Sequence, residues 1–154
     1  MDYVTAKWLH VLSSTLLFGT GLGSAFYLYF ASRTRDARAV AVVARYVVVA
    51  DYLFTATTAI FQPLSGWYLA KLAGLPMTTG WIAWSFVLYA LAAACWLPVV
   101  WIQIRMRNLA MEAAATDAAL PPRYFELFRV WTIFGMPAFV AFIAIFWLMI
   151  AKPA

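Results

Sequence analysis

The sequence predicts an all-α, polytopic membrane protein, a bundle of four transmembrane helices with both termini outside. Composition is the first observation: 66% of the 154 residues are hydrophobic and 11% are charged, with a mean hydropathy of +0.85. Such a chain has too few polar side chains to cover the surface of a soluble domain. Four apolar stretches, 5–31, 40–72, 81–104 and 130–150, reach the length of about 20 residues that crosses a bilayer core. Because they use nearly the whole chain, residues 1–154 are expected to form one domain.

The positions of the basic residues predict the orientation of this bundle. All eight arginines lie in two segments: Arg33, Arg35, Arg38 and Arg45, then Arg105, Arg107, Arg123 and Arg129. The three lysines, Lys7, Lys71 and Lys152, lie at the opposite ends of the apolar stretches. Basic residues near span ends stay in the cytoplasm, so both arginine segments should be cytoplasmic, which only an even number of spans allows. The chain is therefore expected in a bacterial inner membrane, with both termini periplasmic.

The net charge of +5 does not indicate a nucleic-acid partner. Arginines beside the cytoplasmic ends of membrane helices contact anionic lipid headgroups, and this explains the basic balance. The lipid bilayer is therefore the expected partner, and no nucleic acid is expected. A single cysteine, Cys95, excludes an intrachain disulfide and is expected to pack inside the third span.

The first stretch, 5–31, is too long for the hydrophobic region of a signal peptide and lacks a preceding basic segment, so it is expected to remain as a helix. It carries the only histidine of the chain, His10. At 100° per residue, one helix face carries this histidine and mostly small residues, namely Ser14, Leu17, Gly21 and Ser24. Such a face admits a flat ligand or a neighbouring helix. Since ionisable residues inside a membrane are costly, His10 is a candidate for ligand binding or proton handling, with helix packing as the alternative.

Two glycines, Gly19 and Gly23, form a small-xxx-small pair on the opposite face of the same helix. Small residues four apart let membrane helices approach closely, so a close helix contact is expected there. Replacement of Gly23 by leucine is then expected to impair assembly.

The second stretch, 40–72, is the most polar of the four. It contains Asp51, whose unpaired carboxylate would cost about 2.5 to 3.5 kcal/mol in a membrane and which therefore needs a partner. Gln103 and Arg105 of the third stretch lie at a compatible depth and are the expected partners, in a structural polar clamp. Further along, Gln62 and nearby hydroxyls are expected to satisfy carbonyls freed by Pro63, with a kink there. This helix should face a cavity or the bundle centre.

The connections predict how the helices follow one another. Gly/Pro-containing residues 73–80 break helix and form a short outer turn. Alanine-rich residues 106–119 are expected to continue the third helix beyond the membrane, until Pro121 and Pro122 stop it. Residues 123–129 then lead into the fourth span.

The sequence lacks the sets of residues that most catalytic and metal sites need. One histidine, one cysteine and scattered methionines cannot assemble a closed zinc or copper site from one chain. No Ser-His-Asp set or pair of carboxylates is visible.

Several motifs resemble those of a family of uncharacterised four-helix bacterial integral membrane proteins, a domain of unknown function. They are Lys7-Trp8-Leu9-His10, Phe18-Gly19, Pro63-Leu64-Ser65-Gly66 and Gly80-Trp81-Ile82-Ala83-Trp84. More distantly, the chain is similar to the HemJ and CopD-like membrane proteins. HemJ proteins carry Lys-x-x-His in a first helix, Gly-Trp opening a later helix, and an Arg-aromatic-Phe-Glu lead into a last helix that ends in Lys-Pro. The matching residues here are Lys7 and His10, Gly80-Trp81, Arg123-Tyr124-Phe125-Glu126 with Pro137, and Lys152-Pro153.

The HemJ resemblance implies a b-type haem held by His10, with Lys7 in the same motif, and a link to protoporphyrinogen oxidation. The lysine that follows Gly-Trp in HemJ is replaced here by Trp84 or Ser85, so the catalytic residues are not carried over. A single histidine leaves the sixth iron position open, or filled by Met149, Met77 or a neighbouring chain.

Three hypotheses for function follow. The first is a haem b or porphyrin-related redox role through His10 as the metal ligand, with Lys7, Ser14 and Gly21 beside the cofactor. The second is a non-catalytic accessory subunit, in a homo-oligomer or a larger membrane complex of respiratory or photosynthetic type. The third is a transporter of copper or a small solute. An absorption spectrum of the purified protein separates the first two.

Overall fold

The computed structural model describes residues 1–153, which contain helices and no strand. The helices are α1 (Tyr3–Thr34), α2 (Ala37–Ala50), α3 (Ala56–Leu72), α4 (Gly80–Ala115) and α5 (Pro122–Ala151). A π-helical turn, η1 (Asp51–Thr55), joins α2 to α3, so that the three form one continuous rod. The structure thus has four helices long and apolar enough to cross a membrane, namely α1, the α2–η1–α3 rod, α4 and α5. The predicted all-α class and the four spans are confirmed.

Local chemistry explains where the helices begin and end. After α1, Arg35 adopts a left-handed backbone with φ of 60°, and the Asp36 carboxylate then accepts hydrogen bonds from the first backbone amides of α2. Pro122 occupies the first turn of α5, where its missing amide hydrogen has no cost. Between α3 and α4, Gly74 has a φ of +64°, which a residue with a side chain rarely adopts. α4 runs on to Ala115, so the third helix extends beyond residue 106 as predicted, but its predicted end is wrong. The helix stops before Pro121 and Pro122, in a turn where Asp117 has a left-handed backbone with φ of 54°.

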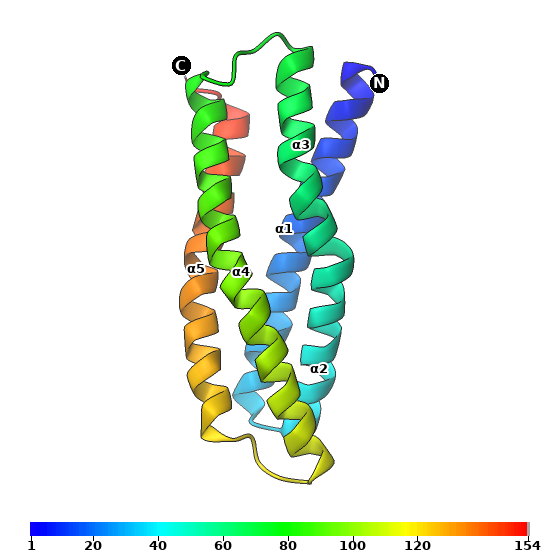
Figure 1. Ribbon diagram of the computed structural model, residues 1–154, viewed down its shortest axis with the longest axis vertical. Coiled ribbons are helices and arrows are strands. Elements are labelled where there is room, and N and C mark those ends of the chain that lie inside the picture. Colours follow the sequence, from blue (N-terminus) through cyan, green and yellow to red (C-terminus); the bar gives the residue numbers. More distant parts are fainter. Residues whose placement is uncertain (154) are drawn as a thin grey trace.

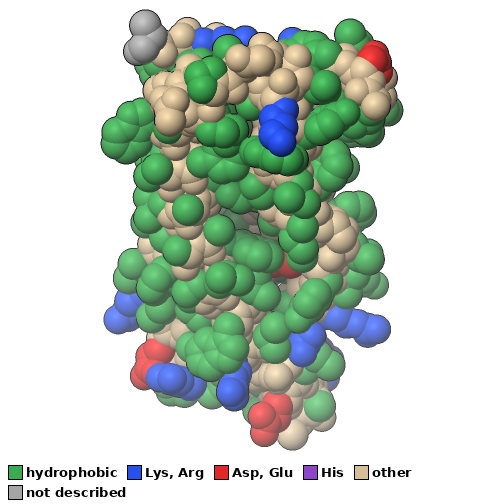
Figure 2. All heavy atoms as spheres, turned by 45° about the horizontal axis from the view of Figure 1, so that its top comes forward, with side chains coloured by type: hydrophobic (Ala, Val, Ile, Leu, Met, Phe, Trp, Pro, Cys, Tyr) green, Lys and Arg blue, Asp and Glu red, His purple; other side chains and the backbone are tan. Residues whose placement is uncertain are grey.

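The rods alternate in direction, so the chain has two distinct ends (Figure 1). Both termini and the α3–α4 turn lie at one end, which we call the terminal end. The α1–α2 and α4–α5 connections lie at the other, the arginine end, because all eight arginines lie in or near these connections. Figure 2 shows Lys and Arg side chains gathered toward the two ends, with a broad, mostly hydrophobic belt between them.

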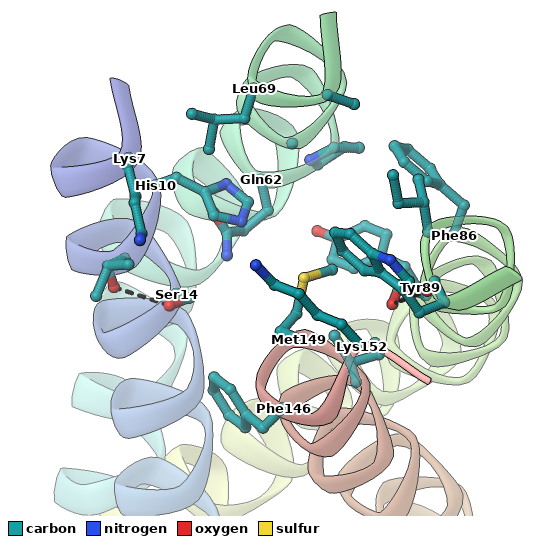
Figure 3. Close-up of a pocket in the computed structure, with 18 of the residues that line it drawn as sticks. Lys7, His10, Ser14, Gln62, Leu69, Phe86, Tyr89, Phe146, Met149 and Lys152 are labelled. Carbon is teal, nitrogen blue, oxygen red and sulfur yellow. Dashed lines mark hydrogen bonds between the residues drawn. The ribbon is translucent and has the colours of Figure 1, made fainter. Parts of the chain in front are cut away.

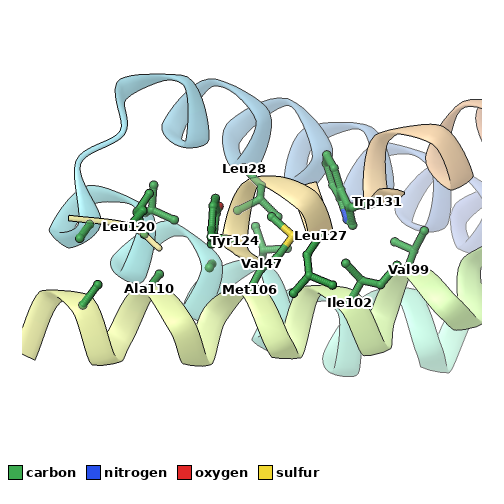
Figure 4. Close-up of a cluster of buried hydrophobic side chains, with 14 residues drawn as sticks. Leu28, Val47, Val99, Ile102, Met106, Ala110, Leu120, Tyr124, Leu127 and Trp131 are labelled. Carbon is green, nitrogen blue, oxygen red and sulfur yellow. The ribbon is translucent and has the colours of Figure 1, made fainter. Parts of the chain in front are cut away.

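The hydrophobic core lies toward the arginine end, where α1, α2, α4 and α5 meet (Figure 4). Leu28, Val40, Met106 and Tyr124 are fully buried there. The Tyr124 hydroxyl lies 2.6 Å from the Ser32 hydroxyl, which itself donates to the Leu28 carbonyl. Since the Ser32 proton is used in this way, Tyr124 is the donor of the bond between them. This bond ties α5 to α1 inside the core.

Large apolar side chains cover the outside of the bundle. Among them, Val4, Phe26, Ile60, Leu97 and Trp147 are all more than half exposed. A soluble protein would bury such a belt, whereas lipid tails solvate it. The spans therefore contact the bilayer directly.

The expected close contact at Gly19 and Gly23 is wrong within this chain. A Cβ built at either glycine, or at Gly21, meets no heavy atom within 4 Å. The helices pack instead through other faces of α1, and Gly19 is exposed while Gly23 is half-buried. The sequence rule recognised a surface that permits close packing, but no helix of the same chain occupies it.

Candidate functional site

A cavity of about 400 Å³ lies at the terminal end, between α1, α3, α4 and α5. Toward this end α3 and α4 diverge (Figure 1), so that α1 and α3 form one wall and α4 and α5 the other. Aromatic and aliphatic side chains line most of it. The polar and ionisable side chains in the lining include Lys7, His10, Ser14, Gln62, Tyr89 and Lys152 (Figure 3). The cavity has the size and mixed lining of pockets that bind small molecules.

His10 extends from α1 toward α3 and is held there by one hydrogen bond. Its Nδ1 atom lies 2.7 Å from the hydroxyl oxygen of Ser65. That hydroxyl also lies 2.8 Å from the Phe61 carbonyl, which can only accept. The same hydroxyl lies 3.1 Å from the Gln62 carbonyl as well. The single hydroxyl proton is used by these two carbonyls of its own helix, and we therefore assign the donor of the first bond to Nδ1 of His10. In the neutral imidazole this leaves Nε2 with a free lone pair, which no hydrogen bond within residues 1–153 uses.

Gly66 provides the space in which the imidazole lies. A Cβ built on this glycine would be 3.4 Å from Cε1 of His10. A Cβ built on any of the other glycines would meet no heavy atom within 4 Å. Ser65 and Gly66 therefore act together, one holding the ring by a hydrogen bond and the other leaving room beside it. They lie one turn from Gln62 on α3, at a spacing that turns all three toward α1.

Two further polar side chains differ in what they offer to a ligand. The Gln62 Oε1 atom is buried and has no hydrogen-bond partner among residues 1–153. Since a buried amide oxygen without a partner is costly, Gln62 is ready to accept a hydrogen bond from a ligand. The hydroxyl of Ser14 instead donates to the Val11 carbonyl of its own helix at 2.8 Å.

Tyr89 of α4 links the two walls at the bottom of the cavity. Pro63 has no amide hydrogen, which leaves the carbonyl of Ala59, four residues earlier, without its helical partner. The Tyr89 hydroxyl donates to this carbonyl. The expectation that hydroxyls and Gln62 of the same helix would satisfy it is therefore wrong. The hydroxyls of Thr57 and Thr58 donate to carbonyls of η1, and that of Ser65 donates to other carbonyls of α3. The donor to Ala59 comes from the neighbouring helix, which the sequence of α3 could not indicate.

Asp51 lies away from the cavity, at the start of η1, and belongs to a separate polar network. Its side chain accepts hydrogen bonds from Nε2 of Gln103 at 2.7 Å and from the hydroxyl of Thr55 at 2.9 Å. The Gln103 carboxamide oxygen in turn accepts from the indole of Trp131 on α5 at 3.1 Å. Gln103 was one of the two expected partners and is confirmed. The other, Arg105, packs its guanidinium over the Trp101 ring instead.

The structure brings together some of the residues singled out in the sequence and separates others. Lys7, His10, Ser14 and Gln62 all line the cavity, whereas Gly21 and Asp51 do not. Of the methionines considered as iron ligands, Met149 lines the cavity and Met77 does not. Sequence reasoning missed Tyr89, and it named Ser65, Gly66 and Lys152 only as parts of motifs and not as residues of the site. Helical spacing from Gln62 could have indicated Ser65 and Gly66.

Within residues 1–153, no group of three or more His, Cys, Asp or Glu side chains could hold a metal ion. Any metal held here would need a ligand of its own, such as a macrocycle.

The family described as "Predicted integral membrane protein (DUF2269)" matches residues 4–153. No curated protein and no solved structure matches the chain.

Proposed function

Because this chain belongs to the DUF2269 family of predicted integral membrane proteins, it works within a bilayer, and we propose that its cavity holds a b-type haem or a related porphyrin, with His10 as the iron ligand. One observation carries the proposal: the Ser65 hydroxyl, which donates to the Phe61 carbonyl, lies 2.7 Å from Nδ1 of His10. Acceptance of the Nδ1 proton by Ser65 would leave the Nε2 lone pair available beside the cavity. Metal-ligating histidines are typically held in this way, since the hydrogen bond fixes both the tautomer and the ring plane.

The remaining lining of the cavity fits a flat, apolar macrocycle. Phe86 and Phe146 face the cavity from α4 and α5 and would exclude water from its interior (Figure 3). Gly66 leaves the space beside the imidazole free of a side chain. Met149 supplies a thioether from the opposite wall, and His/Met pairs are used to ligate haem iron. A b-type haem bound here would supply one-electron chemistry at its iron.

We also propose the orientation. The eight arginines at the arginine end would lie in the cytoplasm of a bacterium, and the terminal end with its cavity would face the periplasm. His10 lies seven residues into α1, so at 1.5 Å per residue it would be about 10 Å below the tip of that helix. The cavity would then open toward the outer surface of the inner membrane.

An absorption spectrum tests the haem proposal. Protein purified in neutral detergent and titrated with haem b should develop a Soret band, and His10→Ala should abolish or strongly shift this band. Ser85→Ala is the matched control, because Ser85 lines the other wall and bonds only to the Trp81 carbonyl of its own helix. If the protein binds no haem, the proposal is overturned. If haem binds and His10→Ala leaves its spectrum unchanged, the ligand comes from elsewhere, and the accessory-subunit hypothesis replaces it.

A further inference from the structure

The cavity contains two ammonium groups and no carboxylate. Lys7 and Lys152 belong to its lining, and none of the Asp or Glu residues described in the chain does. Within residues 1–153 the ion pairs are Arg38 with Asp117 and Arg123 with Glu126, both at the arginine end. Neither cavity lysine is thus neutralised by a described side chain, although the wall around it is mainly apolar.

The two lysines come from opposite walls. Lys7 is in the second turn of α1, and Lys152 directly follows the last turn of α5, with a left-handed backbone that turns the chain out of the helix. The Lys152 ammonium lies 5.6 Å from the ring centre of Trp81, a lining residue of α4. Figure 3 shows the Lys152 side chain extending from α5 into the space that His10 and Gln62 face from the other side.

The two lysines lie at a different depth in the cavity from its apolar lining. Lys7 precedes His10 by three residues on α1 and therefore lies about 4.5 Å nearer the terminal end at 1.5 Å per residue. Lys152 lies at the end of α5, beyond Met149 and Phe146. Positive charge is thus placed toward the terminal end, while the deeper lining is aromatic and aliphatic.

We infer that Lys7 and Lys152 bind the acidic groups of an amphipathic carboxylate whose apolar body lies in the cavity. In the proposed function this ligand class consists of porphyrins that keep their two propionates free, and to that extent the inference rests on the proposed function. A carboxylate at each lysine forms an ion pair reinforced by a charge-assisted hydrogen bond, whereas a neutral ester carbonyl accepts only the weaker hydrogen bond from the ammonium. The lysines therefore select acids over neutral esters of the same shape.

Lys71 provides a matched control for both cavity lysines. It lies at the same end of the molecule, near the end of α3, and its ammonium packs 4.1 Å from the ring centre of Trp67. It does not line the cavity. Replacing Lys71 changes the net charge as much as replacing either cavity lysine, but leaves the cavity unaltered.

The test compares haem b with its dimethyl ester on purified protein in neutral detergent. We expect the wild-type protein to bind the acid about tenfold more tightly than the ester, which corresponds to about 1.4 kcal/mol. Lys7→Gln and Lys152→Gln should each reduce this ratio about threefold, the double variant should bring it close to one, and Lys71→Gln should keep it. Raising the salt concentration should lower the ratio in the wild type, since the bonds are electrostatic.

A second probe separates this inference from the haem proposal. A fluorescent long-chain fatty acid and its methyl ester carry the same carboxylate chemistry without a metal. If haem acid and haem ester bind equally, and the lysine variants change nothing, the inference is overturned while the haem proposal stands. If neither haem form binds, but the fatty acid binds in a manner that depends on Lys7 and Lys152, the haem proposal fails and the inference stands. Failure of both acids to bind overturns both.

Discussion

Gln103 of α4 donates a hydrogen bond of 2.7 Å from its Nε2 atom to Oδ2 of Asp51, at the first residue of the π-helical turn. Both side chains are about 95% buried. The bond joins the second rod to α4 near the level where the packed core gives way to the cavity. The Gln103 oxygen also accepts from Trp131, so that one carboxamide connects three rods.

This relationship predicts that Gln103→Leu destabilises the protein. The substitution leaves the buried Asp51 with a single donor and Trp131 without its acceptor, which should cost about 1–3 kcal/mol. Gln62→Leu is the same substitution at a carboxamide whose oxygen has no partner, and it should be nearly neutral. Thermal unfolding in detergent measures both changes. Equal effects of the two would contradict the role of the network.

Tyr89→Phe should destabilise the protein by removing the donor to the Ala59 carbonyl. A carbonyl left without a partner inside a membrane protein costs about 1–2 kcal/mol. The decisive comparison is the same change in a Pro63→Ala background, where residue 63 regains an amide hydrogen that can bond to Ala59. Tyr89→Phe should cost clearly less there. If the cost is the same in both backgrounds, the hydroxyl does not act through this carbonyl.

Ser65→Ala should change the tautomer of His10. Because His10 is the only histidine, ¹⁵N-histidine labelling gives the signals of one imidazole, and these report which nitrogen carries the proton. The wild type should be protonated at Nδ1, and the variant should shift toward protonation at Nε2, since Nδ1 loses its acceptor. The control Ser85→Ala should leave the signals as in the wild type. A wild-type imidazole already protonated at Nε2 would contradict the assignment.

Gly66 should tolerate alanine but not leucine. An alanine Cβ would lie 3.4 Å from Cε1 of His10, an ordinary contact distance, so the ring can stay in place. A leucine side chain would occupy the space of the ring and push it away from Ser65. The His10 signals should therefore be unchanged in Gly66→Ala and altered in Gly66→Leu. As a control, Gly19→Leu should leave them unchanged, because nothing lies within 4 Å of a Cβ there.

Reporter fusions test the proposed orientation. Fusions after the last residue and within residues 74–80 should report a periplasmic location, and a fusion within 113–119 a cytoplasmic one. The expectation depends on eight arginines lying at one end of the bundle and three lysines lying at or near the other. A periplasmic signal from residues 113–119 would overturn the orientation and, with it, the outward-facing cavity.

The sequence by itself determined the four spans, because hydropathy and length act locally and do not depend on neighbouring helices. The break between the second and third spans followed from the Gly/Pro content of residues 73–80. The cap at Asp36 and the end of α4 at Ala115 were found only in the structure. The sequence also indicated that Asp51 needed a buried partner and that Gln103 lay at a compatible depth, because depth in a membrane follows from position along a span. His10 and Gln62 were recognised as polar residues in apolar stretches, Ser14 by its position on the face of His10, and Lys7 by the motif resemblance.

Only the tertiary structure decided which of these residues meet. The divergence of α3 from α4 creates the cavity, and it depends on contacts between residues far apart in the chain, such as Tyr89 with the Ala59 carbonyl. The rotation of α1 turns His10 toward Ser65 and leaves Gly19 facing outward, although the sequence marked both faces as suitable for packing. A helical pattern gives the angle between side chains on one helix, but the free energy of packing the whole bundle fixes which face turns inward.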